Sequence, residues 1–147
     1  MARIIRLDKI STGVPVTFKN SIANLEQGFF LELKGLANDF EAYKVELAGA
    51  NPEGTVVVHA TPEMMYDERL LIQDFVLAEG RIGRGFILGA GDVITIAEDL
   101  VTGAVSVGDK VGYAAGGKLA AGATKKVYEV ISKENFGGQP SVVLHVL

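Results

Sequence analysis

Glycine divides this sequence into short segments, and that spacing limits what the chain can form. The 147 residues include 18 glycines, and a glycine inside a helix costs about 1 kcal/mol relative to alanine. Most segments between the glycines are β-branched or alternate apolar with polar residues, which is typical of strands. In the last third such segments recur about every ten residues, a spacing that predicts a β-barrel or β-sandwich. These segments are GFIL, GDVITIAED, VGDKVGYA, GKLAA, KKVYEVISKE and PSVVLHVL.

Two segments in the first half predict a β-hairpin. GFFLELKGL and EAYKVELAG both alternate apolar with polar residues, and this period of two is that of a strand covered on one side. We therefore expect them to pair around the intervening stretch ANDFE.

The middle of the chain differs from both ends. Residues 61–63 read Thr-Pro-Glu, which is a helix-start signature, but glycines soon follow and no clean apolar period develops. We expect a short helix or a long loop around residues 62–85. The predicted fold class is mainly β, a single compact β-barrel or β-sandwich-like domain over residues 14–147, with residues 1–13 as an N-terminal arm or a first strand.

Composition excludes several classes of function. The chain has no cysteine, which removes disulfides, thiolate metal sites and cysteine nucleophiles. Its net charge is −4 and its basic residues are scattered, so we expect no nucleic acid partner. No apolar run approaches the ~20 residues of a membrane span, and the first residues do not form an export signal, so we expect synthesis in the cytoplasm and no membrane partner.

The segment GYAAGGKLAAG poses a specific question, because it contains the spacing G-x-x-x-x-G-K of a phosphate-binding loop. Such a loop needs a helix directly after it, and Gly122 leaves no room for one. Leu119 also stands where a serine or threonine would bind Mg²⁺. We therefore predict two short strands joined by Ala115, Gly116 and Gly117 in a tight turn.

No other group of residues forms a recognisable catalytic or metal-binding pattern. His59 and His145 are single histidines in β-rich runs, where a packed or surface role is more common than metal ligation. Glu63, Asp67 and Glu68 lack the spacing of a calcium loop and predict a solvated acidic loop. The serines lack the Gly-x-Ser-x-Gly elbow of hydrolases. The sequence thus predicts no enzyme, no cofactor and no metal.

Two stretches are candidate contacts with a partner or a second subunit. The first lies in the basic and apolar N-terminus, which could order on binding by adding a strand to a neighbour's sheet, or could be an ordinary first strand. The second is a methionine and tyrosine patch suited to adaptable contacts, for which burial inside the same domain is the alternative. The candidate residues are Arg3, Ile5, Arg6, Met64, Met65 and Tyr66.

One stretch carries a resemblance to a known family. Residues 66–122 read YDERLLIQDFVLAEGRIGRGFILGAGDVITIAEDLVTGAVSVGDKVGYAAGGKLAAG, and EVISKENFGGQPSVVLHVL closes the chain. These phrases, with a weaker echo in VTFKNSIANLEQGFFLELKGL, resemble the head decoration, or cement, proteins of tailed bacteriophages. The resemblance implies a β-rich module, often oligomeric, bound on the outside of the capsid, and it transfers no functional residue.

The resulting prediction is a non-enzymatic virion protein that binds the outer surface of the phage capsid and stabilises the head. Its expected partners are the major capsid protein and further copies of itself, as a dimer or trimer, and repetition over a lattice would add avidity. Two alternatives stay open. One is another phage structural component, such as a tail or head-completion protein, and the other is a small carbohydrate- or ligand-binding β-module.

Overall fold

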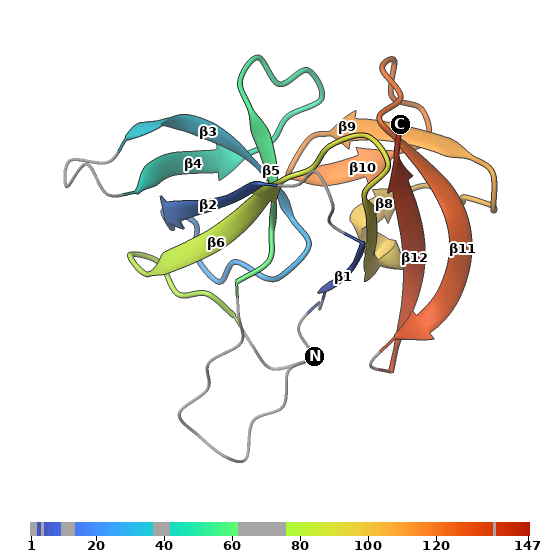
Figure 1. Cartoon of the computed structure of the whole chain (residues 1–147), viewed down its shortest axis with the longest axis horizontal. Coiled ribbons are helices and arrows are strands. Elements are labelled where there is room, and N and C mark those ends of the chain that lie inside the picture. Colours follow the sequence, from blue (N-terminus) through green and yellow to red (C-terminus); the bar gives the residue numbers. More distant parts are fainter. Residues whose placement is uncertain (1–2, 4, 10–13, 37–41, 62–75, 137) are drawn as a thin grey trace.

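The computed structural model describes residues 3, 5–9, 14–36, 42–61, 76–136 and 138–147. Strands dominate, and they form two assemblies, a closed barrel and a separate sheet (Figure 1). The predicted mainly β fold with a barrel is therefore confirmed. Residues 62–75, including the predicted helix start after Thr61, lie outside the described residues, whereas residues 82–87 of the same stretch form a strand.

The barrel closes through five strands in the order β2-β4-β3-β5-β6, because β6 pairs with both β5 and β2. Only β2 and β4 run parallel among these pairs. The strands are β2 (Val14–Lys19), β3 (Phe30–Leu36), β4 (Tyr43–Leu47), β5 (Val56–His59) and β6 (Ile82–Ile87). The antiparallel pairing of β3 with β4 confirms the predicted hairpin.

Two glycines in β6 make room for the large side chains inside the barrel. A β-carbon on Gly83 would lie 2.7 Å from Cζ of Phe18, and one on Gly85 would lie 2.7 Å from Cγ2 of Val57. Because real β-carbons do not approach other atoms so closely, β6 needs glycine at both positions. The barrel interior consists mainly of Phe18, Leu25, Leu31, Val45, Val57 and Leu77.

The second assembly is a seven-stranded sheet in the order β1-β7-β12-β11-β9-β10-β8. Its strands are β1 (Ile5–Lys9), β7 (Val93–Ala97), β8 (Val101–Thr102), β9 (Lys110–Ala114), β10 (Lys118–Ala120), β11 (Tyr128–Phe136) and β12 (Gln139–Val146). A short 3₁₀-helix, η2 (Glu98–Leu100), connects β7 to β8. The β8–β10 pair is parallel and the other pairs are antiparallel.

The main hydrophobic core lies between the barrel and the sheet, and Phe30 of β3 joins the two. Its ring centroid is 5.5 Å from those of Tyr113 and Tyr128, which come from the sheet. Leu31, the next residue along β3, points into the barrel instead. The sequence predicted a strand covered on one side, but both residues are fully buried because the sheet covers the outer face of β3.

The Gly116–Gly117 turn is the predicted hairpin turn. Strands β9 and β10 pair antiparallel on either side of it, and both glycines have positive φ, 78° and 73°. The turn also contacts the barrel, since the amide of Phe30 donates a 2.9 Å hydrogen bond to the carbonyl of Gly117. Leu119, at the position where a phosphate loop has its hydroxyl, is fully buried in the main core. The segment is a structural hairpin.

Candidate interaction surfaces

The N-terminal strand β1 forms one edge of the seven-stranded sheet. Arg6 is paired with Thr95 of β7, and the pairing shifts register between Leu7 and Lys9. Ile5 and Leu7 pack against the main core, so Arg6 between them faces the opposite side of the sheet. We call that side the outer face of the sheet. The division of the chain into an arm of residues 1–13 and a domain of residues 14–147 stays a prediction.

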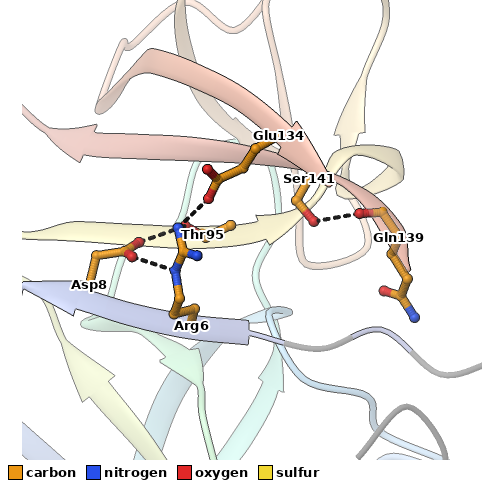
Figure 2. A network of polar contacts seen from close by, with 6 residues as sticks. All are labelled: Arg6, Asp8, Thr95, Glu134, Gln139 and Ser141. Carbon is orange, nitrogen blue, oxygen red and sulfur yellow. Dashed lines mark hydrogen bonds and ion pairs between the residues drawn. The ribbon is translucent and has the colours of Figure 1, made fainter. Parts of the chain in front are cut away.

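Arg6 is the centre of a polar network on this outer face (Figure 2). Its guanidinium donates hydrogen bonds to Asp8, to Glu134 of β11 and, at 3.1 Å, to Oγ1 of Thr95. The Thr95 hydroxyl in turn donates to Oδ2 of Asp8 at 2.6 Å, and the Arg6 cation lies 4.9 Å from the ring centroid of Phe136. The network therefore binds β1 to β7 and β11 through side chains as well as through the backbone.

Arg3 connects the chain before β1 to both assemblies. Its Nε and Nη2 atoms donate to the two carboxylate oxygens of Asp99 in η2, both at 2.9 Å, while Nη1 donates to Glu26 in the loop between β2 and β3. The hydrogen bond to Asp99 is the main reason that the pKa of Arg3 is raised. Because Glu26 belongs to the barrel side and Asp99 to the sheet side, Arg3 joins the two.

Three of the six predicted contact residues thus lie together, along or next to β1. The guanidinium groups of Arg3 and Arg6 are engaged by acidic residues of the same chain, and Ile5 is half-buried. The other three, Met64, Met65 and Tyr66, lie outside the described residues. A role for any of the six in binding a capsid or a second subunit stays a prediction.

His59 is enclosed at one end of the barrel. Its Nδ1 donates to the carbonyl of Glu26 at 2.7 Å, so its Nε2 accepts from the Thr61 hydroxyl at 2.6 Å. That hydroxyl accepts the amide N–H of Arg84 at 3.0 Å, which leaves its own proton for the histidine. Burial disfavours the imidazolium and lowers the pKa of His59 to about 4. His59 is therefore a neutral structural residue.

Cations without acidic partners lie on the wall of the barrel. We call this surface the barrel-wall patch and define it by the exposed residues Thr17, Lys19, Lys44, Ile82 and Arg84. Within the described part of the chain, its three cations form no ion pair. Sequence reasoning missed the patch. Lys19 follows the apolar Phe18, and Lys44 precedes the apolar Val45, so the sequence indicates that both lysine side chains point outward. It does not show that β2 and β4 are neighbours.

The clefts of the molecule show no catalytic arrangement in the described regions. A cleft of about 760 Å³ lies at the junction of the barrel and the sheet, and its charged lining residues are Glu53, Lys125 and Lys126. A smaller one beside Arg3, about 590 Å³, is bordered by Asp99 and Pro140. No described cluster of histidine and acidic side chains could hold a metal ion. Nor does a described helix have the length and hydrophobicity of a membrane span.

Comparison with known proteins gives one informative match. No protein-family model and no curated protein matches the sequence. Among solved structures, the fold is similar to that of the head fiber gp8.5 N base in bacteriophage phi29, with a TM-score of 0.55 and 12% sequence identity. The match covers 92% of this chain and 95% of that chain. At this low identity the likeness concerns the fold, and over nearly its whole length the chain is similar in fold to a part of a phage head fiber.

Proposed function

We propose that the protein is a non-enzymatic structural protein of a tailed-phage virion, which binds the outside of the capsid and stabilises the head. The observation that carries this proposal is the fold similarity to a phage head fiber base, which extends over 92% of the chain and 95% of the other protein. Because folds host many functions, the similarity supports the proposal only together with the independent resemblance of residues 66–147 to head decoration proteins.

The proposed partners are the major capsid protein and other copies of this chain, as a dimer or trimer. Many copies bound to neighbouring capsid subunits would hold firmly even if each contact were modest, because simultaneous contacts raise the effective concentration of each binding surface. Stabilisation of the head would follow from linkage, since a protein that binds only the assembled shell shifts the equilibrium toward that shell.

A second candidate is the base of a head fiber that does not itself reinforce the shell. The fold match favours it directly, because the matching structure is described as the N base of a head fiber. The two candidates share the place of attachment and differ in the consequence. A cement protein bridges neighbouring capsid subunits and binds only the assembled shell, so it raises the temperature at which the capsid breaks open. A fiber base that contacts a single subunit binds it before and after the shell opens, and it leaves that temperature nearly unchanged.

Binding to capsids tests both. Purified protein is mixed with expanded capsids of the encoding phage that lack it, and separately with tails, and each mixture is sedimented. We expect saturable co-sedimentation with capsids and none with tails. Calorimetry of decorated and bare capsids then distinguishes cement from fiber base. Absence of binding to any capsid would remove both candidates, and binding to tails alone would indicate a tail component.

A further inference from the structure

The barrel-wall patch gathers its cations through strand pairing. Lys19 of β2 and Lys44 of β4 are directly paired positions on neighbouring parallel strands. On the other side of β2, Lys19 is paired with Ile82, and Thr17 is paired with Arg84. Positions paired in this way, and those two residues further along, are neighbours on one face of a sheet. Lys19 therefore lies between Ile82 and Lys44, and Arg84 lies beside Thr17, so the three cations share one wall of the barrel.

This arrangement differs from that of Lys34 and Lys133, which have acidic partners. The side chain of Lys133 pairs with Glu98 at 2.8 Å, and that of Lys34 pairs with Glu32 at 3.0 Å. Lys34 also lies 3.7 Å from Glu46, the acidic residue that borders the patch along β4. Like charges on paired strands repel, so the Lys19–Lys44 pair gives the free protein no stability. The chain as a whole carries a charge of −4, so the cluster does not reflect a general excess of cations.

The patch also exposes an apolar side chain at its β6 side. Ile82 is 52% exposed and lies beside Lys19 on the outside of the barrel. An exposed isoleucine beside cations fits a partner that offers carboxylates next to an apolar spot, which a protein surface can do. A phosphodiester backbone offers charge without an apolar surface, and three cations on an acidic chain supply little counterion release.

We propose that the barrel-wall patch, through Lys19, Lys44 and Arg84, binds an acidic protein surface on the capsid. This inference rests on the proposed function, because the capsid supplies the partner. Charge complementarity would act mainly on the rate of association and on specificity, and it would weaken as salt screens the cations. The patch would thus orient the protein with its barrel wall on the shell and the seven-stranded sheet away from it.

Charge reversal tests the patch against a matched control. The double variant Lys19→Glu/Lys44→Glu is compared with Lys125→Glu/Lys126→Glu, which changes the net charge equally at two exposed lysines in the loop between β10 and β11. A third variant, Lys19→Arg/Lys44→Arg, keeps the charge. Capsid binding is measured by sedimentation at low salt and at about 0.5 M NaCl, where the Debye length falls to a few ångströms. Circular dichroism and thermal midpoints verify that each variant folds.

We expect the patch reversal to weaken capsid binding about tenfold or more at low salt, and the control reversal and the arginine variant to change it less than about threefold. Wild-type binding should also fall with salt. Equal binding by the wild type and both reversal variants would overturn the inference and leave the proposed function standing. If the arginine variant lost as much binding as the reversal, the role of charge would likewise be excluded.

A second experiment needs no capsid. If the wild type does not bind capsids, it distinguishes a failure of the proposed function from a failure of the inference about the barrel-wall patch. Fluorescent poly-L-glutamate and a short DNA duplex are titrated with each variant at low salt. Retention of poly-L-glutamate by the wild type and the control, with loss in Lys19→Glu/Lys44→Glu, supports recognition of acidic protein surfaces. Tighter binding of the duplex than of poly-L-glutamate would assign the patch to nucleic acid. That result, or equal binding of poly-L-glutamate by all variants, would overturn the inference.

Discussion

The edge of the sheet at β1 and the wall of the barrel both carry cations, but they use them differently. At β1, Arg3 and Arg6 are neutralised by acidic residues from three other elements of the same chain. On the barrel wall, Lys19 and Lys44 lie on paired positions and form no ion pair within the described residues. The first set contributes to the cohesion of the fold. The second contributes no such bonds, and this difference, together with the clustering at paired positions and the exposed Ile82, is what marks the barrel wall as a binding surface.

Barrel and sheet should unfold together, and Phe30→Ala tests this with the largest expected effect. Phe30 is fully buried and joins the barrel to Tyr113 and Tyr128. Its truncation should lower the free energy of unfolding by about 4 kcal/mol, through lost burial and the cavity left behind. Urea denaturation followed by backbone and tyrosine circular dichroism should show one coincident transition at a lower midpoint. Two separate transitions in the wild type would show that the regions are independent.

Phe136→Ala is the control for that experiment. Phe136 is half-buried on the outer face of the sheet, where it contacts the cation of Arg6. Because its ring is not enclosed between the two assemblies, its loss should cost clearly less than the loss of Phe30. An equal cost would mean that the outer face contributes to the core as much as the junction does.

His59 gives the next largest effect, through pH. Its folded-state pKa is about 4, below the ordinary value of 6.5, because burial disfavours the charged ring. Between these values the unfolded chain binds a proton that the folded chain does not, so stability is complete above pH 6.5 and falls as pH drops toward 4. The loss should reach about 3 kcal/mol. Urea midpoints measured between pH 7 and pH 4 give the slope.

The matched variants for this prediction are His59→Gln and His145→Gln. Carboxylates also titrate near the lower end of the range, so the informative quantity is the difference in slope from the wild type. His59→Gln should be less stable at pH 7, and its urea midpoint should change less with pH below 6.5 than that of the wild type. His145→Gln should keep the wild-type dependence of the urea midpoint on pH. A wild-type slope that survives in His59→Gln would assign the acid sensitivity to other groups.

Arg6→Ala and Lys19→Ala compare the two sets of cations directly. Removing Arg6 takes away the hydrogen bonds to Asp8, Thr95 and Glu134, and it should destabilise the fold by about 1 kcal/mol, since the pair with Glu134 is partly exposed and screened. Lys19→Ala removes an exposed side chain without such partners and should leave stability nearly unchanged. Urea denaturation curves of the two variants and the wild type measure both changes in the free energy of unfolding. Equal losses would contradict the distinction between the two regions.

Local chemistry was predictable from the sequence, whereas the pairing of distant strands was not. The Gly116–Gly117 turn and the β3–β4 hairpin follow from residues within a few positions of each other. The parallel neighbourhood of Lys19 and Lys44, and the placement of β1 beside β7, join segments whose sequences do not identify their partners. For the same reason Arg6 could be selected as a candidate contact with a partner, but its engagement by Glu134 of the same chain could not be foreseen.

The smallest prediction concerns the repulsion on the barrel wall itself. Lys44→Gln removes one of two like charges on paired positions, so it should stabilise the fold by about 0.3 kcal/mol at low salt, and the gain should vanish near 0.5 M NaCl. Lys110→Gln is the control of opposite sign, because Lys110 of β9 stands opposite the acidic Glu129 of β11 in the strand register. Loss of the Lys110 charge removes an attraction and should destabilise the fold slightly. Thermal midpoints of both variants at low and high salt measure the effect. If Lys44→Gln also destabilised, the lysine would be contributing to the fold, and the barrel wall would no longer differ from the sheet edge in the way that makes it a binding surface.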